Sequence, residues 1–208
     1  MNIIASWIPI ASTFSVLAPL FLLLRNFKSY DLEIKALAFF LSIGFSVDMA
    51  TWYFYTAKNN AALYGLHHAY DLFESGFLFW FLGRVSPFPR VRFLFTKMWV
   101  ILFPWWLMRF YYPGWTSWFK TSTEVFIAFA SCFLILGLVE KTDNISRSLV
   151  VWILLGIFFY CFCTYFILGT LVLVFTKTWF SHNLVNITTN LIYCIGFIRA
   201  KRELATKK

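Results

Sequence analysis

Apolar residues are gathered into seven long windows along the chain. They are Ile3–Leu24, Ala36–Ala57, Ala61–Gly83, Phe93–Tyr111, Thr121–Val139, Leu149–Phe175 and Phe180–Ile198. Each comes near or exceeds the roughly 20 residues that an α-helix needs to cross the hydrocarbon of a bilayer. The pattern predicts an all-α integral membrane bundle of seven transmembrane helices, forming a single domain over residues 1–208. The sixth window is overlong, so we expect it to tilt, to kink near Gly156 or Gly169, or to project beyond the membrane.

The composition supports a lipid environment for these windows. Of 208 residues, 61% are hydrophobic and 13% charged, and a water-soluble fold of this size could not hide so much apolar surface. Aromatic residues make up 23%, and many Trp and Tyr fall at window ends, where their rings suit the headgroup layer. The four cysteines, Cys132, Cys161, Cys163 and Cys194, lie inside apolar windows and predict neither a disulfide framework nor a zinc finger.

The basic residues predict the orientation. Fourteen of the 18 fall on one side of the predicted membrane: Arg25, Lys28, Lys35, Arg84, Arg90, Arg92, Lys97, Lys141, Arg147, Arg199, Lys201, Arg202, Lys207 and Lys208. The other side has Lys58, Arg109, Lys120 and Lys177. Because cytoplasmic loops are rich in Lys and Arg, we expect the N-terminus outside the cell and the C-terminus in the cytoplasm. The membrane would be the cell (inner) membrane.

The net charge of +9 does not indicate nucleic acid as a partner. The basic residues are dispersed among short loops and the tail, with no separate soluble domain to carry a basic patch. The connections are also too short to form a catalytic domain outside the membrane. We therefore expect any function to lie within the bundle.

Ionisable residues inside the windows form the candidate site. An ionisable side chain in a span costs about 2.5 to 3.5 kcal/mol on insertion scales, so each needs a partner or a role. The predicted topology places these side chains in the outer half of the membrane. They are Asp48, His67, His68, Asp71, Glu74, Glu124 and His182.

Two polar stripes follow from helical periodicity. Tyr64, His67, Asp71 and Glu74 fall along one face of the third helix, and His182, Asn186 and Asn190 repeat every four residues in the seventh. The stripes should face one another rather than lipid. They could form a hydrogen-bond network that fixes packing, or a ligand, metal or proton site that opens outward.

For a metal, the candidate ligands are His67, Asp71 and His182, with Asp48 or Glu74 as a fourth ligand or general base. Neutral imidazole and carboxylate are ordinary zinc ligands, so zinc is a candidate cofactor. A second alternative concerns Arg109, which lies among aromatic residues near the predicted outer surface. These rings form either a cation–π lid over a pocket or an aromatic interfacial belt.

The segment NNAALYGLHHAYDLFE, residues 59–74, resembles a poorly characterised group of bacterial seven-span proteins common in Bacteroidota. In that group a pair of Asn leads to a His, an aromatic residue and then a Glu in the third span, and some members look like sensor halves fused to histidine kinases. The resemblance implies that His67 or His68 and Glu74 are the polar positions of the family. It also implies that this chain would signal through a separate membrane or signalling partner.

The last predicted span differs from that of two other seven-span groups. Microbial rhodopsins need a Schiff-base lysine in the last span, and Phe180–Ile198 contains none, so covalent retinal is not expected. Ceramidases and adiponectin-receptor-like hydrolases hold zinc between an Asp and several His. Asp71, His67 and His182 are similar in kind, but Asn186 stands where the last span of those enzymes has a second His.

The sequence favours a receptor-like or accessory protein over an enzyme, and it leaves both open. Its outward-opening polar pocket would recognise a small ligand or a partner. One alternative is a zinc-dependent intramembrane hydrolase, in which metal-bound water is activated and a nearby carboxylate takes the proton. The other is a structural subunit whose aromatic surface packs against a larger membrane complex.

Overall fold

The structure, a computed structural model, describes residues 3–112, 115–140, 148–167 and 178–206, and the regular secondary structure of these residues is all helical. The α-helices are α1 (Ile3–Ser15), α2 (Leu17–Arg25), α3 (Leu32–Thr56), α4 (Asn60–Val85), α5 (Pro89–Thr96), α6 (Trp99–Met108), α7 (Trp115–Val139), α8 (Leu149–Phe166) and α9 (Thr178–Thr206), with a 3-10 turn, η1 (Phe27–Ser29), after α2. The all-α prediction is confirmed for these residues. Gly169 and residues 168–175 of the sixth window lie outside them.

In the described part of the chain, five helical segments are long and apolar enough to cross a membrane, and they indicate a membrane protein. They are Trp7–Arg25, Leu32–Thr56, Pro89–Met108, Trp118–Val139 and Leu149–Phe166. Only a helix or a closed barrel can bring a backbone through hydrocarbon, because every N–H and C=O needs a partner there. The many exposed apolar side chains, such as Phe21, Val100 and Phe129, then contact lipid.

Two of the predicted windows contain a break in the helix. Pro19 has no N–H to donate to the carbonyl of Ser15, and helix α1 gives way to α2 at this point, with Val16 between them. The window Phe93–Tyr111 is divided into α5 and α6 by a turn at Lys97 and Met98. Helix α8, in contrast, continues through Gly156.

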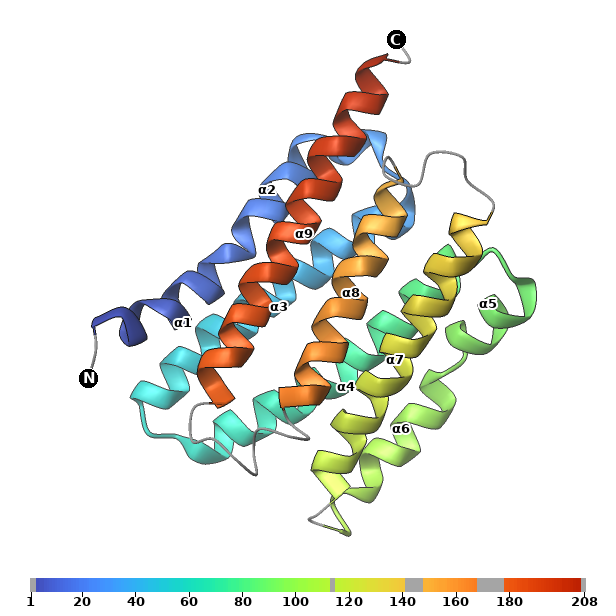
Figure 1. The fold of residues 1–208 in the computed structure, drawn as a ribbon. Helices are drawn as coiled ribbons and strands as arrows, with labels where there is room; N and C mark the ends of the chain where they lie inside the picture. The colour runs from blue at the N-terminus through green and yellow to red at the C-terminus, as the bar shows by residue number, and fades with distance from the viewer. Residues whose placement is uncertain (1–2, 113–114, 141–147, 168–177, 207–208) are drawn as a thin grey trace.

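Within the described residues, six rods form a closed ring, where a rod is one long helix or the consecutive pair α1–α2. Figure 1 shows how these helices lie beside one another. The combined α1–α2 rod packs against α3, α3 against α4, α4 against α7, α7 against α8, and α8 against α9, which returns to α1 and α2. Helices α5 and α6 lie outside this ring, against α4 and α7. The ring closes between the first and last helices of the chain, where Asn190 Nδ2 donates a hydrogen bond to Ser15 Oγ at 2.7 Å.

The two ends of the ring differ in packing. At the end where α4 finishes and α9 approaches the C-terminus, large apolar side chains fill the interior, among them Leu23, Leu37, Phe81, Leu82 and Phe197, each 2% exposed or less. Phe rings on α3 and α4 continue this core; Phe40 and Phe77 stack with centroids 4.4 Å apart. The opposite end, where α3 finishes and α4 begins, holds the polar residues.

The contact between α8 and α9 requires a glycine. A Cβ at Gly156 would overlap the ring of Tyr193, whereas a Cβ at Gly65 on α4 would meet no atom within 4 Å. We expect Gly156→Ala to lower the free energy of unfolding by about 1–3 kcal/mol, since an overfilled interface must shift backbone or rotamers. Gly65→Ala should leave it unchanged or raise it, because Ala favours a helix.

Thermal unfolding of the two purified variants in the same detergent checks this. Equal midpoints for Gly156→Ala and Gly65→Ala would show that the α8–α9 crossing is not as close as the structure has it.

Candidate functional site: a polar cavity within the helix ring

A cavity of about 180 Å³ lies inside the ring, toward the end where α3 finishes and α4 begins. All six rods of the ring line it, so it is a product of tertiary packing rather than of one motif. We call it the central polar cavity. Its lining residues are Ser12, Val16, Phe40, Leu41, Gly44, Phe45, Val47, Asp48, His67, Tyr70, Asp71, Glu74, Leu78, Lys120, Ile157, Tyr160, His182, Asn186, Thr189, Asn190 and Tyr193.

Both polar stripes predicted from the sequence reach this cavity. From the third and seventh predicted spans, now α4 and α9, it receives six of their side chains, and α3 adds one more. These seven are Asp48, His67, Asp71, Glu74, His182, Asn186 and Asn190. Seven residues that lie up to 142 positions apart, from 48 to 190, thus share one space.

Tyr64 and His68 lie away from the central polar cavity. Tyr64 is 61% exposed and two turns before Asp71 on α4, beyond the end of the cavity. Its ring meets the imidazole of His68 edge-on, with centroids 3.7 Å apart. His68 is turned from His67 by the helical rotation of about 100° and is buried.

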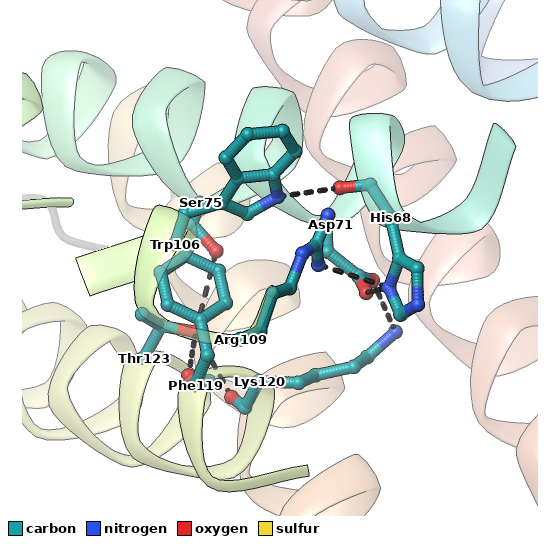
Figure 2. Close-up of polar contacts among 8 residues, drawn as sticks. All are labelled: His68, Asp71, Ser75, Trp106, Arg109, Phe119, Lys120 and Thr123. Carbon is teal, nitrogen blue, oxygen red and sulfur yellow. Dashed lines mark hydrogen bonds and ion pairs between the residues drawn. The ribbon is translucent and has the colours of Figure 1, made fainter. Parts of the chain in front are cut away.

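His68 contacts α6 rather than a ligand space (Figure 2). Its Nδ1 lies 2.9 Å from Arg109 Nη1, and its carbonyl accepts a hydrogen bond from Trp106 Nε1 at 2.8 Å. Because a guanidinium only donates, Nδ1 must accept, and the imidazole proton sits on Nε2. The guanidinium of Arg109 also lies over the Trp106 ring at 4.2 Å. Arg109 is therefore a buried packing residue that fixes α6 on α4, and its aromatic neighbours do not cover the central polar cavity.

An ion pair joins α4 and α7 at the cavity wall (Figure 2). Lys120 Nζ donates to Asp71 Oδ1 at 3.1 Å, and His68 Nδ1 lies 3.9 Å from Asp71 Oδ2. The Asp71 side chain is 11% exposed and that of Lys120 31%. One turn further along α4, the Ser75 hydroxyl donates to Thr123 Oγ1 at 3.2 Å, so polar contacts continue along the same helix pair.

Glu124 lies one turn beyond Lys120 on α7, outside the central polar cavity. It lines a second, narrow hollow of about 10 Å³, together with Asp71, Glu74, Lys120, Thr123 and others. The residue is 5% exposed, and neither carboxylate oxygen has a hydrogen-bond partner in the described part of the chain. This hollow has room for about one water molecule.

Several cavity residues were missed by the sequence analysis. Tyr70, Tyr160 and Tyr193 lie inside apolar windows, whereas the sequence analysis interpreted only the Tyr and Trp residues at window ends. Lys120 was assigned to an outer loop because it precedes the fifth window by one residue. Its spacing from Glu124 was a local signal of a helical contact, but nothing in the sequence indicated its pairing with Asp71.

The predicted metal ligands are not gathered around one point. Within the described residues, no group of three or more His, Cys, Asp or Glu side chains is placed where it could hold a metal ion. His67, Asp71 and His182 line the same cavity, but Asp71 is engaged by Lys120. The zinc site and the hydrolase alternative therefore stay predictions.

Comparisons with protein-family models, curated proteins and solved structures give no match to this chain. The resemblance of residues 59–74 to a bacterial sensor-like group stays a prediction. The cavity itself has hydrogen-bond donors and acceptors, carboxyl groups and aromatic side chains around a space of about 180 Å³, which is large enough for a small ligand. Small-molecule sites have this character, with a few polar groups set among apolar and aromatic walls.

The Asp71–Lys120 pair should contribute to stability. We expect Lys120→Met to lower the free energy of unfolding by about 2 kcal/mol, because it leaves a largely buried carboxylate without its charged donor. Adding Asp71→Asn should recover part of this loss. Lys97→Met, at an exposed position after α5, should have little effect.

Chemical or thermal unfolding of the single and double variants forms a double-mutant cycle. Additive effects of Lys120→Met and Asp71→Asn would mean that the two side chains do not interact.

Proposed function

We propose that this protein is a receptor-like or accessory membrane protein of seven spans whose central polar cavity recognises a small ligand. The observation that carries the proposal is the cavity of about 180 Å³, to which all six rods of the ring contribute polar or aromatic side chains. A network that served packing alone would have its groups in contact, with no ligand-sized space between them.

Seven spans are supported by α4 and α9. These helices are less apolar than the other five because their polar residues face the cavity, and they run between the same two ends of the bundle (Figure 1). With 26 and 29 residues they extend about 39 and 43 Å at 1.5 Å per residue, enough to cross about 30 Å of hydrocarbon.

The proposed orientation places the mouth of the cavity outside the cell. Most basic residues belong to the connections at the opposite, apolar end and to the C-terminal tail. At that end Arg84 forms an ion pair with Glu33, with Nη2 2.8 Å from Oε1. His67 is the most accessible of the cavity histidines and lies one to two turns into α4. A ligand would then enter from the outer side of a bacterial inner membrane.

A ligand bound in this cavity should accompany the purified protein. Gly44 lines the cavity and a Cβ there would lie 3.1 Å from the Tyr70 hydroxyl, so Gly44→Leu fills space that a ligand would use. We expect small-molecule extracts of the wild-type protein to contain a compound that is depleted in extracts of Gly44→Leu, as measured by mass spectrometry. Gly65→Leu, in open space on α4, is the matched control and should retain it.

The proposal would be contradicted by two results together. In the first, the small-molecule extracts of wild type, Gly44→Leu and Gly65→Leu do not differ. In the second, a library of polar metabolites is screened by thermal unfolding, and no compound stabilises wild type more than Gly44→Leu.

A further inference from the structure

We infer that the ligand of the central polar cavity is a small organic ammonium ion. This inference rests on the proposed function and adds the chemical class of the ligand.

The first argument is the balance of charges in the cavity. Among the described residues, three acidic side chains line it, from Asp48, Asp71 and Glu74, against one ammonium group, that of Lys120. Lys120 is already bonded to Asp71. A carboxyl group in a low-dielectric site either takes up a proton or is balanced by a positive charge, and an anionic ligand would meet two acids to which Lys120 is not bonded.

The positions of those two acids, Glu74 and Asp48, indicate where in the cavity a cation would bind. Glu74 is 8% exposed and takes part in a hydrogen bond with the Tyr160 hydroxyl. Asp48, on the facing helix α3, lines the cavity and makes no hydrogen bond or ion pair with any residue that the structure describes. A cation placed between α3 and α4 would meet Asp48 directly.

A second and independent observation is the hydroxyl of Thr189. The residue is 5% exposed and lines the cavity, and its Oγ1 has no hydrogen-bond partner among the described residues. Buried hydroxyl groups are nearly always paired, so an orphan that borders an open space indicates a partner that occupies the space. A ligand N–H or O–H group would supply that partner.

Aromatic walls favour an organic cation over an inorganic one. The rings of Phe40, Phe45, Tyr70, Tyr160 and Tyr193 all line the cavity. An ammonium carried on carbon is attracted to such faces and loses less hydration than a metal ion, which needs several ordered oxygen or nitrogen ligands. No group of three His, Cys, Asp or Glu suited to a metal occurs in the described part of the chain.

The cavity volume limits the size of the ligand. An engineered protein cavity of roughly 150 Å³ holds benzene, so about 180 Å³ accommodates about six to ten non-hydrogen atoms. Choline and putrescine fall within this range. They represent a quaternary and a primary ammonium respectively.

The experiment measures thermal unfolding of the purified wild-type protein in lipid nanodiscs with each probe at up to about 10 mM, at constant ionic strength. We expect choline or putrescine to raise the unfolding midpoint. 3,3-Dimethylbutan-1-ol, the uncharged isostere of choline, and sodium succinate should not. Asp48→Asn should weaken the apparent affinity for the cationic probe by about tenfold or more, because it removes the unpaired carboxylate.

Asp31→Asn is the matched control, since Asp31 is exposed at the start of α3 and its side chain makes no capping hydrogen bond. It should bind the probe as wild type does. If Asp48→Asn does not fold, Glu74→Gln takes its place, with Glu140→Gln, an exposed position after α7, as its control. Weakened binding in Glu74→Gln alone then supports the inference.

Three outcomes overturn the inference. One is no shift with either ammonium probe; another is an equal shift with the uncharged isostere; the third is full retention of the shift in the acid variants. None of these decides the proposed function, which is contradicted only when the extracts do not differ and no library compound stabilises wild type more than Gly44→Leu. A neutral or anionic probe that stabilises wild type but not Gly44→Leu would keep the ligand cavity and reject the ammonium class.

Discussion

The structure depends on the cost of placing charged side chains in hydrocarbon. Asp48, Asp71, Glu74 and Lys120 all belong to helices of a membrane protein, and each faces the interior of the ring. Insertion of such groups toward lipid would cost several kcal/mol each. This constraint fixes the rotation of α3, α4 and α7 about their axes, and the contact between Asp71 and Lys120 then sets how α4 and α7 meet. The cavity is the space that these inward-facing polar groups enclose.

Much of the fold follows from the windows of apolar residues. The all-helical, membrane-embedded character was predicted from them, and it is confirmed for the described residues. The breaks at Val16 and Lys97 were not predicted, because hydrophobicity alone does not report a local loss of helical hydrogen bonds. Closure of the ring by Asn190 and Ser15 also lay beyond the sequence, since it joins residues 175 positions apart.

The candidate site could be predicted where helical periodicity governs it. His67, Asp71, Glu74, His182, Asn186 and Asn190 were placed on two stripes, and the structure brings both stripes to one cavity. Periodicity turns His68 away from His67, but it could not indicate its neighbour Arg109 at the end of α6, and it could not place Lys120, which stood at the edge of a window. The three cavity tyrosines were hidden because an aromatic ring in a span has the same sequence signature whether it faces lipid or a ligand space.

The central claim is that a water-accessible polar cavity opens to the outside between the helices of the ring. Labelling of single cysteines in intact cells tests it most directly, after Cys132, Cys161, Cys163 and Cys194 are replaced. Asn186 lines the cavity, whereas Leu184, two residues away on α9, is 43% exposed on the outer surface of the ring. The account predicts that a membrane-impermeant, positively charged methanethiosulfonate added outside modifies Asn186→Cys and leaves Leu184→Cys unmodified. An Asn186→Cys protein that the reagent leaves unmodified would contradict the account, whether or not Leu184→Cys reacts.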